Sequence, residues 1–282
     1  MRSLPYEVCD VFTDRPFAGN ALAVFTDANG LDDATMQALA RETNLSETAF
    51  VLPPTVSEAD ARIRIFTPTM ELPFAGHPTL GSAFVLAAAL GREQVRLETG
   101  KGVIPVRLTR EGGRLVFGWM TQPLPRIGPY PAPAELFAAL GIAGSRLPVD
   151  LYDNGPHYVF VELESPRDVA ALRPDMARLG VLGSTAFSVF ARNGERWKTR
   201  VFAPGEGIAE DPATGAAAGP QAVHLARYGK IQFGDEVVIE QGAEIGRPST
   251  LHACAFGSTE RLERVEVGGG AVVVARGEFR LP

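Results

Sequence analysis

The feature that most constrains the fold is an internal repeat with an offset of nearly half the chain. Arg64-Ile65-Phe66-Thr67-Pro68 is echoed by Arg200-Val201-Phe202-Ala203-Pro204, an offset of 200 − 64 = 136 residues. Upstream, Thr48-Ala49-Phe50 is echoed by Thr185-Ala186-Phe187, an offset of 185 − 48 = 137. Because the echoes keep their order in a chain of 282 residues, they predict two lobes of similar build, each with strands wrapped around a central helix.

Each predicted central helix opens at a glycine-bearing turn. In the first half, Gly76-His77 separates the strand-like run Ile63–Phe66 from Thr79–Leu90, which is apolar on every face and therefore indicates an enclosed helix. In the second half, Asp211-Pro212-Ala213-Thr214-Gly215 precedes a helix over about residues 214–228, where Pro220 predicts a kink or a delayed start. Free backbone N–H groups at such helix entrances favour the binding of an anion.

The boundary between the lobes is predicted from proline content. Residues 1–122 form the first lobe, 123–133 a linker and 134–282 the second lobe, and the terminal strand could pack on either lobe. The linker carries Pro123, Pro125, Pro129, Pro131 and Pro133. So many prolines are incompatible with a helix or a central strand.

Composition excludes several classes of function. The net charge is −6 with 27 basic residues that form no cluster, so neither nucleic acid nor an anionic membrane is an expected partner. No targeting segment and no membrane-length apolar run is visible, which favours a cytoplasmic protein. Cys9 and Cys254 lie in alternating strands as packing residues, and the four histidines lack ligand spacing, so no metal is expected. The expected partner is a small molecule.

Three side chains could carry acid–base chemistry, although each has an ordinary structural role as well. Asp211, before Pro212 and a helix, has the pattern of an N-terminal cap. His77 at a helix N-terminus is pushed toward its neutral form, which suits a proton donor or acceptor. Glu47 at a strand start would ordinarily be solvated. In combination, two helix N-termini facing one interlobe cleft could hold a substrate carboxylate while these three groups move a proton.

Three ordered motifs make the resemblance specific. Asn44-Leu45-Ser46-Glu47-Thr48-Ala49-Phe50, Glu71-Leu72-Pro73-Phe74-Ala75-Gly76-His77-Pro78-Thr79 and Asp211-Pro212-Ala213-Thr214-Gly215 resemble the phenazine-biosynthesis isomerase (PhzF-like) family across essentially the whole chain. That family is similar to diaminopimelate epimerase, which implies an α+β fold of two pseudo-symmetric lobes, each a curled, mostly antiparallel sheet around a central helix. The resemblance also implies a homodimer without a cofactor.

The resemblance implies an isomerase acting on a small cyclic amino acid such as dihydro-3-hydroxyanthranilate. Glu47 would match the family's proton-transferring acid/base, with His77 and Asp211 beside it. The substrate-binding positions would be the carboxylate cradle and the Gly-Asn turn, that is Gly76, His77, Gly215, Ala216 and Asn20.

Departures from the family pattern bear on the substrate and on rival functions. Ala216 stands where the phenazine enzyme has Ser, and Ala21 where Pro often follows the Gly-Asn pair. Related epimerases carry a Cys at both helix entrances, where this chain has Ala75 and Asp211, which favours a one-sided proton shift by Glu47 over two-base racemisation. An amino-acid epimerase or racemase, and a non-catalytic small-ligand-binding dimer, remain the alternatives.

Overall fold

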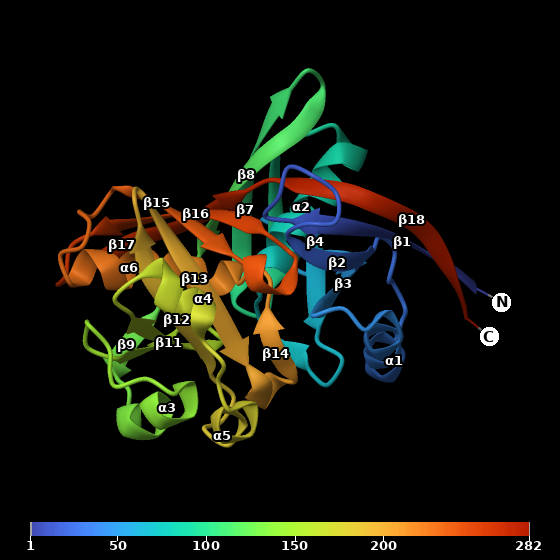
Figure 1. Ribbon diagram of the computed structural model, residues 1–282. Helices are drawn as coiled ribbons and strands as arrows, with labels where there is room; N and C mark the ends of the chain where they lie inside the picture. The colour runs from blue at the N-terminus through green and yellow to red at the C-terminus, as the bar shows by residue number, and fades with distance from the viewer. Residues whose placement is uncertain (1, 282) are drawn as a thin grey trace. The chain divides into compact units, whose positions relative to one another are not determined.

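The computed structural model describes residues 2–281, which form two compact units (Figure 1). Unit 1 comprises the chain as far as Thr121 together with the segment from Gly268 onward, and unit 2 comprises Gln122–Val267. The sequence left open where the terminal strand packs. It pairs along its length with the first strand of unit 1, from Ser3↔Arg280 to Val11↔Ala271.

Unit 1 is a sheet in the order β18-β1-β2-β3-β4-β6-β7-β8, with the short β5 added to β4. Two of these pairings, β2 with β3 and β4 with β6, are parallel. The elements of this unit are β1 (Arg2–Val11), β2 (Asn20–Phe25), α1 (Asp33–Thr43), β3 (Glu47–Leu52), β4 (Ala61–Phe66), β5 (Glu71–Leu72), α2 (Gly76–Leu90), β6 (Gln94–Thr99), β7 (Gly102–Glu111), β8 (Arg114–Gln122) and β18 (Ala271–Leu281).

Unit 2 is a sheet in the order β9-β10-β11-β12-β13-β15-β16, with the short β14 added to β13. Its elements are β9 (Arg126–Pro129), α3 (Pro133–Leu140), β10 (Asp150–Asp153), β11 (His157–Glu162), α4 (Pro166–Ala171), α5 (Met176–Gly180), β12 (Ala186–Asn193), β13 (Arg196–Ala203), η1 (Pro204–Glu206), β14 (Ile208–Asp211), α6 (Gly215–Arg227), β15 (Glu236–Gln241), η2 (Ala243–Ile245), β16 (Ser249–Gly257) and β17 (Leu262–Gly269), which runs to the boundary between the units.

The two units share one topology. From β1 to β7 the successive pairings are antiparallel, parallel, antiparallel, parallel and antiparallel. From β10 to β16 they follow the same sequence of directions. Each unit inserts a two- to four-residue strand and then its long helix at the same point, between the fourth strand and the fifth. The predicted pair of pseudo-symmetric α+β lobes is therefore confirmed.

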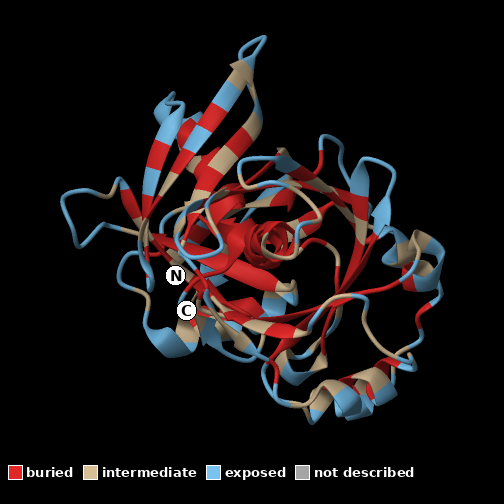
Figure 2. Cartoon of the chain, turned by 90° about the vertical axis from the view of Figure 1, so that its left-hand side faces the viewer, coloured by how far each residue is buried: buried red, intermediate tan, exposed pale blue. Residues whose placement is uncertain are grey.

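The long helix of each unit forms its core. In α2 every residue from Gly76 to Val85 is buried, and exposed residues begin only in the last turn. In α6 every residue from Gly215 to Ala226 is buried, and Figure 2 looks along this helix, which is red within a ring of strands. The β7–β8 hairpin at the top of Figure 2 instead alternates red with tan and blue, as a strand with one covered face should. These patterns fit the enclosed helices predicted from sequence.

The proline-rich segment is more ordered than a linker. Residues 126–129 form β9, which pairs antiparallel with β10, and α3 already begins at Pro133. The prolines flank the short ladder, at Pro125 before it and Pro129 as its last residue, so they do not interrupt its N–H donors. The segment is therefore part of unit 2.

Both cysteines are buried, as expected for packing residues. Burial raises the pKa of the Cys9 thiol strongly and that of Cys254 to about 11. Within residues 2–281 there is no helix whose length and apolar character would let it cross a membrane.

Candidate active site

Glu47 is the first residue of β3 and pairs in register with Leu22 of β2. Because β3 lies between β2 and β4, the residues from Glu47 to Val51 are all buried, and Glu47 itself is only 8% exposed. The ordinary expectation of a solvated glutamate at a strand start is therefore wrong. Burying a carboxylate costs desolvation free energy, so a carboxylate enclosed in this way has either a functional role or partners that offset the cost.

His77 lies beside Glu47. The imidazole Nε2 is 3.5 Å from Glu47 Oε2, and the histidine is 3% exposed. On the other side of the ring, the Asn20 amide donates a hydrogen bond of 3.2 Å to Nδ1. If Nδ1 accepts, the neutral ring carries its proton on Nε2, directed toward the Glu47 carboxylate. The structure thus brings three of the predicted site residues together.

Burial keeps His77 uncharged. Desolvation lowers the pKa of His77 from 6.5 to about 3, so the imidazole is neutral throughout the physiological range. The contact with Glu47 is therefore that of a neutral N–H donor with a carboxylate, rather than an ion pair. This matches the neutral histidine expected at a helix N-terminus.

The Gly-Asn turn fixes Asn20. Gly19 adopts φ +67°, and a Cβ at that position would lie 2.3 Å from the carbonyl oxygen of Val11, so only glycine fits the turn. The next residue, Asn20, opens β2 and is 1% exposed. Ser46 Oγ donates to Asn20 Oδ1 at 3.4 Å, which orients the amide so that its nitrogen faces His77.

The N-terminus of α2 has no side-chain cap. The N-cap residue is Ala75, no acidic residue occupies the first turn, and Thr79 Oγ1 turns back to the Ala75 carbonyl. The helix begins at Gly76, two residues before Pro78. Backbone N–H groups at this end can therefore serve an anion next to His77.

Asp211 closes β14 in unit 2 and does not cap α6. The N-cap of α6 is Thr214, so the capping interpretation is wrong, because three residues still separate Asp211 from the helix. The Asp211 carboxylate accepts a hydrogen bond of 2.6 Å from Thr214 Oγ1. Gln241 Nε2 donates to the Asp211 carbonyl at 2.7 Å and to Thr214 Oγ1 at 2.9 Å. The aspartate is 7% exposed.

The first turn of α6 carries the predicted cradle residues Gly215 and Ala216, again without a side-chain cap hydrogen bond. Pro220 neither starts nor ends the helix, which runs continuously from Gly215. Proline lacks the N–H that would bond the Ala216 carbonyl four residues back. Asn154 Nδ2 supplies that hydrogen bond at 2.9 Å, and Gln122 Nε2 donates to the neighbouring Gly215 carbonyl at 2.9 Å.

Glu206 is a second carboxylate in unit 2, and its pKa responds to the charge of Asp211. Glu206, in η1 between β13 and β14, has its pKa raised by burial and then by the Asp211 charge, while His157 acts in the opposite direction. Sequence reasoning missed Glu206. Its position five residues before Asp211 was the only signal, and the hairpin pairing that brings the two near one another is not visible in the sequence.

Sequence reasoning also missed a pair of arginine–glutamate clamps. In unit 1, Arg64 Nε and Nη2 contact the two Glu71 carboxylate oxygens at 2.7 and 2.6 Å. In unit 2, Arg200 Nε and Nη2 contact those of Glu210 at 2.9 and 2.7 Å. Arg64 and Arg200 stand at corresponding positions of the repeated segments, so for the two arginines the repeat itself was the signal.

Among residues 2–281, no group of three or more His, Cys, Asp or Glu side chains is arranged to hold a metal ion. The chemistry available in unit 1 is therefore that of a buried carboxylate, a neutral imidazole and an uncapped helix N-terminus. Unit 2 offers a buried aspartate before a second uncapped helix.

A family model described as phenazine biosynthesis-like protein (PhzC-PhzF) matches residues 9–277. The chain belongs to this family. The chain is also 48% identical over 276 residues to trans-2,3-dihydro-3-hydroxyanthranilate isomerase of Pseudomonas aeruginosa, with 98% of this chain and 99% of the relative covered. A homologous isomerase from Pseudomonas fluorescens is 49% identical over 276 residues, covering 98% of this chain and 99% of that protein. This PhzC-PhzF family member is therefore an enzyme, an isomerase.

A solved structure supports the same placement. The phenazine biosynthesis protein of the PhzF family from Bacillus anthracis has a TM-score of 0.85 and 25% sequence identity, with all of both chains covered. The predicted family resemblance is confirmed by this match and by the family model.

Proposed function

We propose that this PhzC-PhzF family isomerase moves a proton within a small cyclic amino acid that carries a carboxylate, without a cofactor, and that trans-2,3-dihydro-3-hydroxyanthranilate is the first compound to test. The observation that carries the proposal is the buried Glu47 carboxylate 3.5 Å from an uncharged His77 at the open N-terminus of α2. Identity of 48% to an isomerase named for that compound supports the choice of substrate.

In the proposed reaction Glu47 acts as a single acid/base. Its carboxylate takes a proton from a carbon next to the unsaturated or carbonyl-activated part of the ring, and the resulting carboxylic acid returns the proton at another carbon. The substrate therefore gains and loses one proton, no electron acceptor is required, and the double bonds shift. A positioned general base contributes a factor of about 10²–10⁴ to such a step.

His77 and Asn20 would keep the base in place. The hydrogen bond from Asn20 to Nδ1 sets the tautomer, and the Nε2–H then faces Glu47 Oε2. The imidazole is neutral, so it can hold the Glu47 carboxylate in position. It does so without placing a full positive charge beside that carboxylate. We assign His77 the role of orienting Glu47 and the substrate's polar groups.

Asp211, Gly215 and Ala216 are proposed to act on the same substrate. The uncapped first turns of α2 and α6 supply N–H groups suited to a carboxylate, and Asp211 supplies an acceptor for an amino or hydroxyl substituent. Ala216 offers an N–H without a hydroxyl, so an Ala216→Ser change should alter substrate affinity more than it alters the proton transfer itself.

The proposal is tested by incubating the enzyme with trans-2,3-dihydro-3-hydroxyanthranilate in heavy water and following the ring protons by NMR. A proton shift predicts a product with rearranged double bonds, in which the new C–H bond carries the substrate's own hydrogen when Glu47 returns it directly and deuterium when the carboxylic acid exchanges with solvent first. Deuterium entering a stereocentre of an otherwise unchanged ring, with loss of optical activity, would indicate an epimerase. Binding with neither rearrangement nor exchange would indicate a ligand-binding protein.

The proposal also includes a homodimer, as the PhzF resemblance implies, and a location in the cytoplasm. Analytical ultracentrifugation tests the first point, with a sedimenting mass near twice the 30.1 kDa chain expected. A fluorescent fusion in the native host tests the second.

A further inference from the structure

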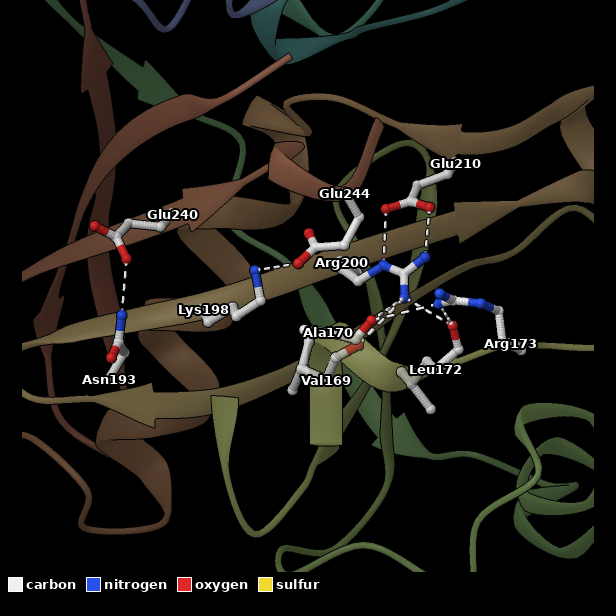
Figure 3. Close-up of polar contacts among 10 residues, drawn as sticks. All are labelled: Val169, Ala170, Leu172, Arg173, Asn193, Lys198, Arg200, Glu210, Glu240 and Glu244. Carbon is white, nitrogen blue, oxygen red and sulfur yellow. Dashed lines mark hydrogen bonds and ion pairs between the residues drawn. The ribbon is translucent and has the colours of Figure 1, made fainter. Parts of the chain in front are cut away.

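Arg200 of β13 is a buried cation with a bidentate partner. It is 5% exposed, and Nε and Nη2 lie 2.9 and 2.7 Å from the two carboxylate oxygens of Glu210 (Figure 3). The side chains of the pair are 6% and 9% exposed. Planar fork-to-fork contacts of this kind fix direction as well as distance, which a lysine cannot do.

The remaining nitrogen of Arg200 ties the pair to a third element. Nη1 donates to the carbonyl oxygens of Val169, Ala170 and Leu172 at 3.3, 3.4 and 2.9 Å. These carbonyls lie at the C-terminal end of α4, where a helix has unsatisfied acceptors and favours a positive charge. Figure 3 shows the guanidinium between Glu210 on one side and these carbonyls on the other. One side chain thus joins β13, β14 and α4.

Glu210 directly precedes Asp211, so the clamp acts on the strand end that presents the aspartate. On the following side, Gln241 holds the Asp211 carbonyl at 2.7 Å and Thr214 Oγ1 holds its carboxylate at 2.6 Å. The register of β14 shifts against β13 between Val201 and Ala203, which leaves a short, irregular ladder to locate this end. Side-chain contacts on both sides therefore determine where Asp211 stands.

The Arg196–Glu240 ion pair of the same strand lacks this geometry. Arg196 Nη1 meets Glu240 Oε1 at 2.9 Å, but the two side chains are 54% and 37% exposed, and the pair does not involve β14. Exposed pairs of this type contribute little. Burying a charge pair costs desolvation free energy that an apolar pair would avoid. A buried arginine–glutamate clamp next to Asp211 therefore indicates that the position of this strand end has to be fixed.

We propose that Arg200 is a positioning residue for the isomerase reaction, fixing Asp211 through Glu210 at the end of β14. The proposal rests on the proposed function of Asp211. It predicts a loss in kcat that exceeds the loss in ligand affinity, because misplacing by about 1 Å a group that orients the substrate toward Glu47 can cost up to about 10²-fold in rate.

The first experiment compares Arg200→Lys with the matched control Arg196→Lys on the same strand. For Arg200→Lys we expect kcat to fall about ten- to a hundredfold, while the Kd for anthranilate, a non-reacting ring carboxylate, changes less than threefold. Arg196→Lys should retain kcat and Kd. Thermal unfolding is measured for both, and if Arg200→Lys does not fold, Glu210→Gln is judged by the same kinetic criteria. Wild-type kcat in the folded variant would overturn the proposal.

A double-mutant cycle separates this proposal from the proposed function. In an Asp211→Asn background, Arg200→Lys should cause no further loss in kcat, because there is no carboxylate left to position. Equal, multiplicative losses in both backgrounds would show that Arg200 acts on the fold in general and would overturn the inference. If Asp211→Asn alone keeps wild-type kcat, the role of Asp211 is wrong. If Asp211→Asn lowers kcat and Arg200→Lys does not, only the inference fails.

Discussion

The two units have the same topology and different chemistry. Each has the same order of strand pairings, an uncapped central helix and a bidentate arginine–glutamate clamp just before it. At the positions that matter, however, the repeat diverges: the offset of 137 places Ser184, which is exposed, opposite the buried Glu47. Likewise, the helices that open at Gly76 and Gly215 carry His77 and Ala216 as their second residues. The two units share their order of strand pairings, and the candidate base Glu47 lies in unit 1.

The same comparison relates two asparagines. Ala49 and Ala186 correspond through the repeat, and they pair with Val24 and Tyr158. Asn20 lies four residues before Val24 (24 − 4 = 20), and Asn154 lies four residues before Tyr158 (158 − 4 = 154). Asn20 donates to the His77 ring and Asn154 to the Ala216 carbonyl that Pro220 leaves without its helical donor. At corresponding positions, Asn20 therefore contacts a candidate active-site residue in unit 1, whereas Asn154 stabilises the central helix of unit 2.

The largest predicted effect concerns the two buried helix histidines, His77 and His224. Burial lowers the pKa of each from 6.5 to about 3, with Arg227 adding to the effect at His224. Between these pH values the unfolded chain binds a proton that the folded chain does not, so stability is lost as pH falls from about 6.5 to about 3. At about 1.4 kcal/mol per pH unit, each histidine accounts for roughly 5 kcal/mol.

Replacing either histidine by Gln should flatten this acid limb, measured as the free energy of unfolding in urea at a series of pH values. The two variants should differ in activity. His77→Gln lowers kcat, because it replaces the rigid imidazole Nε2–H that faces Glu47 with a flexible amide. His224→Gln keeps kcat, because His224 bonds Tyr152 inside unit 2. An unchanged pH slope in both variants, or equal losses of kcat, would contradict the comparison.

The asparagine pair gives the next largest effect. Asn20→Ala should lower kcat by about ten- to a hundredfold, because it frees the His77 tautomer, as loss of an outer-shell partner does elsewhere. Both Asn20→Ala and Asn154→Ala should lower the free energy of unfolding by about 1–3 kcal/mol, since each leaves a buried acceptor without its donor, but Asn154→Ala should keep kcat. Steady-state kinetics and urea unfolding of both variants would decide, and a loss of kcat confined to Asn154→Ala would reverse the assignment.

The smallest predicted effect is at Glu206, which has no counterpart in unit 1. Its raised pKa means that the folded chain holds a proton more tightly than the unfolded chain, so ionisation above the folded pKa opposes folding. Glu206→Gln should therefore raise Tm at pH 7 and leave it unchanged at pH 4. Glu260, whose pKa is lowered by Ser258, is the control and should show no such gain at pH 7.

The repeat made the fold predictable, because Arg64 and Arg200 lie in segments whose order and spacing survive in the sequence. Glu47, His77 and Asn20 were predicted as a group through the family resemblance, and in the structure the His77 ring lies 3.2 Å from the Asn20 amide nitrogen and 3.5 Å from a Glu47 carboxylate oxygen. Pattern reasoning failed where long-range contacts override local rules. Pro220 stays inside a helix because Asn154, 66 positions away (220 − 154), replaces the lost donor.

The same reason explains the other errors. Asp211 has the local pattern of a cap, yet pairing with Val201 holds it in a strand. Arg126–Pro129 has the composition of a linker, yet β10 offers it a partner strand. Burial of Glu47 follows from its place between β2 and β4, which propensity at a strand start does not reveal.

The central claim is that the proton passes through Glu47, and the turnover rate of Glu47→Gln tests it most directly, with Ser184→Ala as the matched control from the other unit. The amide keeps the shape of the side chain and cannot take up the proton, so kcat on a verified substrate should fall by about 10²–10⁴ while anthranilate still binds. Ser184→Ala should turn over as the unmodified enzyme does. Full activity in Glu47→Gln would contradict the account.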